Sequence, residues 1–192
     1  MRKLLFLSAT CLTIWMAQSC ANNTKNPQSE TPVDSAQDVN ASVKPVDEKS
    51  SSFAVDAADG GMMEIAASKL VQDKSQNERV RAFATMMVND HTKAGDELKA
   101  LAQKRNIALP AELSTEDKKH IDDLSKKSGR DFDKSYINMM VEDHDKVVKE
   151  FEAASDNVAD DELKSWARNT LPTLKVHQDS ARAIKDAMND RK

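Results

Sequence analysis

The chain carries one helical motif twice, and this repeat restricts the fold more than any other feature. Residues 83–98 and 136–151 agree at seven of sixteen positions, and both contain Met-Met-Val-x-Asp-His. In each copy apolar residues recur at spacings of three and four, which is the period of one face of an α-helix. His91 and His144 fall on that apolar face. The repeat therefore predicts two helices that each carry an imidazole into a packed interior.

The same periodicity extends over four long segments. They run from about 52 to 75, 77 to 106, 131 to 154 and 160 to 188, and a short helix carrying Ile121 and Leu124 is expected between the second and the third. Charged residues make up 31% of the chain and aromatic residues only 4%, which is typical of helices with solvated outer faces. The pattern predicts an all-α protein in which residues 53–188 form a four-helix bundle with one short extra helix.

Two features interrupt these helical patterns. Gly60 and Gly61 lie inside the first long helix, where each glycine weakens a helix by about 1 kcal/mol. The close approach of a neighbouring helix would be one reason to tolerate them. Pro172 lies inside the last helix and is expected to kink it without ending it, because the apolar stripe continues beyond in register.

Several classes of function lack their sequence signals. The net charge is −4, and no basic stripe with neighbouring aromatic residues is present, so we expect no nucleic-acid partner. The chain has no Walker loop and no G-x-G-x-x-G, G-x-S-x-G or C-x-x-C motif. No catalytic residue is assigned, and protein partners are not indicated.

Residues 1–19 are interpreted as a lipoprotein signal peptide. Arg2 and Lys3 precede an apolar run of about 13 residues, which is short for a membrane span. The run ends in Ala-Gln-Ser-Cys, which resembles a bacterial lipobox, although Gln18 departs from the usual small residue there. Cys20 would then carry the lipid and anchor the protein to a membrane, with ordinary signal cleavage nearby as the alternative. This predicts a cell-envelope protein that faces the periplasm, at the outer membrane.

Residues 20–52 are predicted to form a disordered tether between the anchor and the bundle. Pro27, Pro32 and Pro45 should break any helix there, and apolar residues are too sparse to form a core.

Each of the four long stripes carries one polar residue near its middle, and the set is Glu64, His91, His144 and His177. Burying such groups without partners costs several kcal/mol, so we expect them to meet at one level of the bundle. Three imidazoles and one carboxylate would suit a transition metal ion such as Fe, Zn or Cu. The sequence thus predicts these four residues as candidate metal ligands.

The neighbours of the histidines suggest further contacts. Asp90 and Asp143 could accept a ring N–H from a histidine or add a ligand. Met87 and Met140 stand four residues before His91 and His144, and a thioether beside an imidazole would favour Cu(I). The alternative is that these methionines only fill the core, as methionines at helical spacing commonly do.

The chain resembles a bacterial family, the domain of unknown function 4142. The matching residues are Phe53 with Ala57-Ala58-x-Gly60-Gly61-Met62-Met63-Glu64, Phe83-Ala84 through Asp90-His91, Gly129-x-x-Phe132-Asp133 through Asp143-His144, and Leu171-Pro172-x-Leu174-x-x-His177. The family is grouped with ferritin-like bundles, and its members are often labelled outer membrane proteins. The resemblance implies a ferritin-like four-helix bundle over about 53–188 and implies no particular reaction.

Three hypotheses for the function follow. The first is an envelope lipoprotein that binds a metal without turnover. The second is a non-catalytic envelope scaffold or stress-related lipoprotein whose polar core is purely structural and only specifies helix register. The third is a di-metal oxidoreductase, and it is the least supported. Ferritin-like di-iron proteins use Glu-x-x-His, whereas Val88, Val141 and Leu174 occupy the position three residues before each histidine.

Overall fold

The computed structural model describes residues 31–190, and every secondary-structure element within that range is a helix. The six helices are α1 (Pro32–Val43), α2 (Glu48–Lys74), α3 (Glu78–Arg105), α4 (Thr115–Ser125), α5 (Gly129–Asn157) and α6 (Asp161–Asn189). The predicted all-α class is confirmed. The four long helices and the short α4 lie close to the boundaries that the apolar periodicity indicates.

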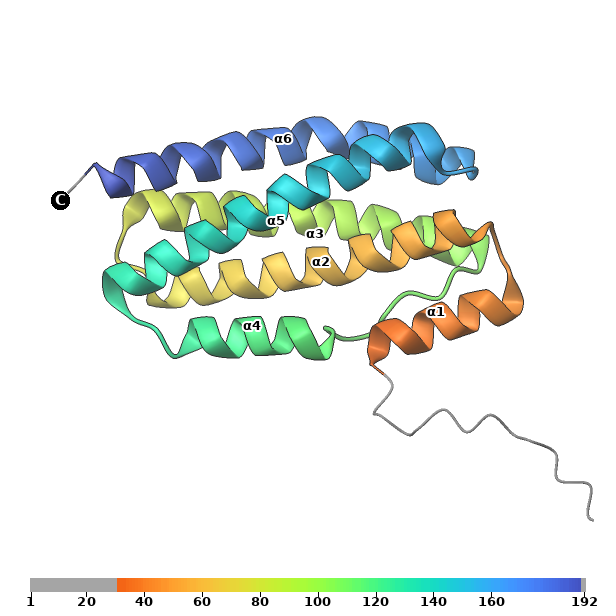
Figure 1. The fold of residues 1–192 in the computed structure, drawn as a ribbon, viewed down its shortest axis with the longest axis horizontal. Helices are drawn as coiled ribbons and strands as arrows, with labels where there is room; N and C mark the ends of the chain where they lie inside the picture. Colours follow the sequence, from red (N-terminus) through yellow and green to blue (C-terminus); the bar gives the residue numbers. More distant parts are fainter. Residues whose placement is uncertain (1–30, 191–192) are drawn as a thin grey trace, which may run out of the picture.

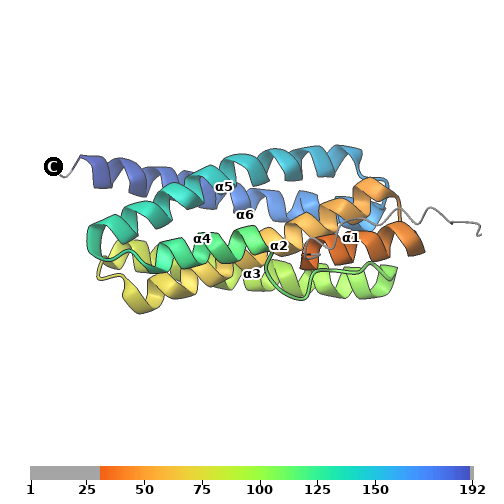
Figure 2. The same ribbon diagram turned by 60° about the horizontal axis from the view of Figure 1, so that its bottom comes forward.

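The four long helices lie side by side and form the body of the molecule (Figure 1). Helices α2 and α6 run in one direction, and α3 and α5 run in the other. The connection from α3 to α5 therefore returns along the whole length of the bundle, and α4 lies within it, against α2 and α5. Helix α1 packs beside α2 at the opposite end (Figure 2).

The ends of the helices follow from local capping chemistry. The Asn77 side chain accepts hydrogen bonds from the backbone amides of Arg79 and Val80, and Ser114 accepts one from Asp117. These bonds satisfy amides that have no partner inside the helix. Asn106 ends α3 in the left-handed conformation, with φ of 57°.

The predicted tether is wrong for residues 32–43 and 48–52, because they form α1 and the start of α2, with a four-residue connection between them. Pro32 occupies the first helical position, where a missing N–H costs nothing, and Thr31 and Asp34 form a capping box around it. Helix α1 is held in place by the buried Asn40, whose amide bonds both the N–H and the carbonyl of Ala108 at 2.7 and 2.9 Å. The proposed signal peptide, Cys20 and the rest of the tether lie outside the described residues.

The apolar core has two parts, with a polar layer between them. One part contains Met87, Phe132, Tyr136 and Met140 among its largest members. The other is built around residues such as Leu98, Leu163 and Trp166. On α3, α5 and α6 the single buried histidine falls between the residues of the first part and those of the second.

Helix α6 continues through Pro172, as predicted. A close helix approach does not explain Gly60 and Gly61, because a Cβ added at either residue would meet no atom within 4 Å. Within residues 31–190, no helix combines the length and the apolar character needed to cross a membrane.

Candidate metal centre

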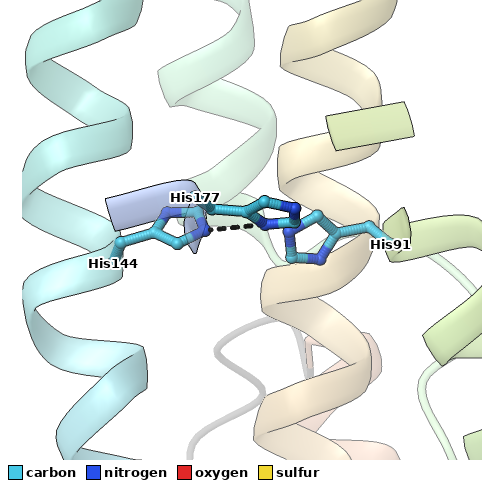
Figure 3. Close-up of side chains that lie close together, drawn as sticks. All are labelled: His91, His144 and His177. Atoms are coloured by element: carbon cyan, nitrogen blue, oxygen red, sulfur yellow. Dashed lines mark hydrogen bonds between the residues drawn. The ribbon is translucent and has the colours of Figure 1, made fainter. Parts of the chain in front are cut away.

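Four buried polar residues meet in the middle of the bundle, one from each long helix. Glu64 comes from α2, His91 from α3, His144 from α5 and His177 from α6, and none is more than 7% exposed. Figure 3 shows the three imidazoles turned toward one another. One ring nitrogen from each histidine lies within 4.8 Å of the other two. The predicted convergence of these side chains is therefore present in the structure.

Each imidazole uses one nitrogen to contact an oxygen atom. His177 Nε2 lies 2.9 Å from Asp90 Oδ2. His144 Nδ1 lies 3.0 Å from the Met140 carbonyl oxygen and 3.1 Å from Glu64 Oε1. His91 Nδ1 lies 3.2 Å from Glu64 Oε2. Such oxygen contacts fix the orientation of a ring and determine which nitrogen carries its proton.

These contacts assign the protons of a neutral cluster. A carbonyl oxygen only accepts, so His144 Nδ1 carries the hydrogen and His144 Nε2 keeps a lone pair. The Asp90 carboxylate likewise takes the hydrogen of His177 Nε2 and leaves a lone pair on Nδ1. These two unprotonated nitrogens face each other at 3.4 Å. His91 Nδ1 lies near Glu64, and His91 Nε2 is buried without a hydrogen-bond partner.

Burial keeps the three imidazoles uncharged near neutral pH, each with a single ring N–H. Burial lowers the pKa of His144 to about 4, with a smaller contribution from His177. Burial and the two other imidazoles hold the pKa of His91 well below 6.5. Burial also lowers the pKa of His177, although the Asp90 hydrogen bond opposes this. Each uncharged imidazole therefore has one ring nitrogen whose lone pair could bind a cation.

The cluster fits a metal ion in its donor atoms, and the pair of His144 and His177 also fits it in spacing. Bonds of about 2.0–2.1 Å from a tetrahedral zinc ion to imidazole place two nitrogens roughly 3.3–3.4 Å apart. The separation of His144 Nε2 and His177 Nδ1 is 3.4 Å. Burial raises the pKa of Glu64 well above 4.5, and a nearby cation would favour its ionised form. The carboxylates of Glu64 and Asp90 would then balance a charge of about +2.

The structure gives Glu64 a different position from the one the sequence predicts. As a ligand it would point toward the same centre as the imidazole lone pairs. Instead its two oxygens lie 3.2 and 3.1 Å from the Nδ1 atoms of His91 and His144. The ligand role of Glu64 stays a prediction, whereas its contacts place it as the group that orients two imidazoles.

The four predicted neighbours of the histidines have different surroundings in the structure. Asp90 contacts a histidine, but that histidine is His177 of another helix. Burial raises the pKa of Asp143 to about 6, and its Oδ2 is buried without a hydrogen-bond partner. Met87 and Met140 are fully buried in the apolar cluster. The sequence prediction does not include the contact of His144 with the Met140 carbonyl, although a helical histidine can reach the carbonyl four residues back.

Comparison with known proteins gives the family and the fold. The chain belongs to the DUF4142 family, a domain of unknown function, whose family model matches residues 35–184. No curated protein matches it. The family match confirms the resemblance on which the sequence analysis drew.

Two solved structures share the helical arrangement. A DUF305 fragment from Deinococcus radiodurans has a TM-score of 0.64 and 15% identity, over 72% of this chain and 96% of that one. A DUF305 protein from Streptomyces coelicolor, described as a candidate secreted protein, has a TM-score of 0.62 and 14% identity, over 73% and 92% of the two chains. At this level of identity the likeness shows the fold alone.

Proposed function

We propose that this protein binds one divalent transition metal ion through His91, His144 and His177. The observation that carries the proposal is the pair of unprotonated nitrogens on His144 and His177, which face each other at 3.4 Å. Two lone pairs at that distance repel unless a cation lies between them. The unpartnered Nε2 of His91 supplies the third donor.

The carboxylates beside the imidazoles have a supporting role in this proposal. Glu64 holds the rings of His91 and His144, and Asp90 holds the ring of His177. Carboxylates that accept the outer N–H of a metal-bound histidine raise the basicity of the ring and fix its tautomer. An ion bound by three imidazoles would supply Lewis acidity. The residues themselves bind, orient and shield the site from water.

We further propose that the protein works in the cell envelope, held to a membrane by a lipid on Cys20. The leader and the lipobox-like Ala-Gln-Ser-Cys support this location. The bundle is proposed to be ferritin-like, because the single long connection between α3 and α5 is a feature of that class. The di-iron chemistry of that class is not proposed, because Glu-x-x-His is absent here.

Elemental analysis of reconstituted protein tests the metal proposal. Purified chain is stripped with a chelator, incubated separately with Zn²⁺, Cu²⁺ and anaerobic Fe²⁺, and freed of excess ion. We expect one equivalent of at least one of these ions in the wild type and in His120→Ala, whose histidine is 48% exposed on α4. We expect none in His144→Ala or His177→Ala. A wild type that retains no stoichiometric ion leaves the polar layer with a purely structural role.

A further inference from the structure

A cavity of about 580 Å³ extends from the metal centre into the second part of the core. Its walls come from α2, α3, α5, α6 and the loop between α3 and α4. Apolar side chains form most of the lining, among them Ala57, Leu98, Leu109, Phe151 and Leu174. Glu64 and His91 lie at one end. Asp56 lies two turns away on α2, so the cavity is about 12 Å long at 1.5 Å of rise per residue. These dimensions are those of a small-molecule site.

Three of the four glycines of the chain line this cavity, namely Gly60, Gly61 and Gly95. All three lie inside helices, where alanine would be more stable. A Cβ added at any of them would meet no atom within 4 Å, so helix packing does not require them. What the glycines do provide is open space along α2 and α3. The chain therefore gives up helix stability to keep the cavity empty of its own side chains.

Trp166 lies in the cavity wall and carries an unused hydrogen-bond donor. Its side chain packs against Phe151, with the ring centroids 5.3 Å apart, and it is 7% exposed. Its Nε1 atom is buried and has no hydrogen-bond partner. An indole N–H can only donate a hydrogen bond, and burying it without an acceptor costs free energy. The complementary group is therefore an acceptor that this part of the chain does not itself supply.

The loop that covers the cavity is fastened at both ends. Asn40 of α1 bonds the backbone of Ala108 on both its N–H and its carbonyl. Asp59 of α2 accepts a hydrogen bond from the Ser114 amide at 2.9 Å. Leu109 and Pro110 between these points line the cavity. The covering wall is thus preformed, which lowers the ordering cost of binding a ligand beneath it.

We propose that this cavity binds a neutral, largely hydrocarbon molecule whose carbonyl oxygen accepts the hydrogen bond of Trp166. The apolar walls would take up the hydrocarbon part. Acidic residues argue against an anionic ligand, since Asp56, Asp96, Glu64 and Glu150 border the cavity and Lys99 is the one cation among them. Burial and the charges of Glu150 and Asp59 raise the pKa of Asp56, which reflects the same negative surroundings. The cavity itself does not depend on a metal; only its position beside a bound ion rests on the proposed function.

Fluorescence with the neutral aromatic ketone Prodan (6-propionyl-2-dimethylaminonaphthalene) tests this proposal. The full chain carries Trp15→Phe, so that Trp166 is its single tryptophan and energy transfer reports binding beside that residue. We expect saturable binding of one Prodan per chain, with blue-shifted emission, in chelator-treated protein. Binding in the absence of metal separates this proposal from the metal proposal, which the metal content of the same samples tests.

Three variants locate the bound probe. Gly61→Leu and Gly95→Leu fill the cavity, and each should weaken Prodan binding at least about tenfold while leaving metal content unchanged. Trp166→Phe keeps an aromatic ring, removes the N–H, and should weaken binding about three- to tenfold. Ala82→Leu is the matched control, because Ala82 is an exposed α3 residue outside the cavity. It should bind Prodan like the parent.

Gly95→Ala tests whether the fold itself needs a glycine at this position. Its methyl group enters open space inside a helix, so the melting temperature should rise by about 2–4 °C. No saturable binding to the parent protein would overturn the proposal. So would binding that Gly61→Leu, Gly95→Leu and Trp166→Phe all leave unchanged.

Discussion

The two copies of Met-Met-Val-x-Asp-His share a sequence and differ in what their histidines do. His144 is fully buried, and both of its ring nitrogens lie near other groups, with Met140 and Glu64 on one side and His177 on the other. His91 is 7% exposed and borders the cavity, and its Nε2 has no partner. One copy thus forms the fixed part of the histidine cluster, and the other forms its accessible edge.

The two aspartates differ in the same way. Asp90 of the first copy reaches across to His177 on α6, at 2.9 Å. Asp143 of the second copy has a buried Oδ2 without a hydrogen-bond partner. The repeat therefore sets which helix face turns inward, while the neighbouring helices decide what each residue contacts.

The largest expected difference between the copies concerns the histidines themselves. His144→Ala and His91→Ala should both weaken metal binding by more than about a hundredfold. Each removes a metal-binding nitrogen, which costs more than removing a residue that only orients an imidazole. Only His144→Ala should also destabilise the metal-free protein strongly, by about 2–4 kcal/mol, since it leaves a cavity and unpaired groups in a dry layer. Urea unfolding in chelator and competition with a chromogenic chelator measure the two effects. Equal destabilisation by both variants would remove the distinction between a fixed part and an edge.

The aspartates should differ by a smaller amount in metal affinity. Asp90→Asn removes the carboxylate that holds His177 and should weaken metal binding about 10- to 100-fold. Asp143→Asn should leave the affinity within about twofold, because no carboxylate–imidazole contact is lost. Competition with the same chelator measures the metal affinity of both variants. Matching losses in both variants would show that the second aspartate also supports an imidazole.

Asp143→Asn should instead change stability, and the effect should depend on pH. Burial raises the folded-state pKa of Asp143 to about 6 from 3.8, so its ionised form is disfavoured in the folded protein. The resulting loss of stability is absent below pH 3.8 and complete above pH 6. After allowance for partial solvent screening, the variant should be more stable by about 1 kcal/mol at pH 7 and equal to wild type at pH 4. Urea unfolding of metal-free protein at both pH values measures this; a constant difference across them would contradict the assignment.

The smallest expected effect on stability concerns the first residue of each copy of the repeat. Tyr136 occupies the position that corresponds to Phe83, and its hydroxyl lies 2.8 Å from Ser68 Oγ in the buried core. Tyr136→Phe should cost about 1 kcal/mol, because the Ser68 hydroxyl loses a partner away from water. Double substitution with Ser68→Ala should recover part of that loss. Additive losses in urea unfolding would show that the two hydroxyls do not interact.

The sequence predicts the helices well because their cause is local. The period of apolar residues and the caps at Asn77 and Ser114 place α3 and α4 without tertiary information. The sequence prediction omits α1 because it takes Pro32 as a helix breaker. The Thr31-Pro32-x-Asp34 pattern is a start signal, because proline suits the first helical position.

The candidate metal site is predictable only in part. The register of the stripes brings His91, His144 and His177 to one depth, so their convergence follows from spacing. The position of Glu64 does not, because the spacing leaves open which side of an imidazole a carboxylate will face. The cavity is also beyond sequence reasoning, since it depends on what faces Gly60, Gly61 and Gly95 from four other segments.

X-ray absorption at the zinc edge tests the central claim most directly. We expect the chain loaded with one equivalent of Zn²⁺ to show outer-shell scattering from three imidazoles and no sulfur near about 2.3 Å. His120→Ala should give the same spectrum. A sulfur shell from a methionine, or fewer than three imidazoles, would contradict the assignment of His91, His144 and His177 as the ligands.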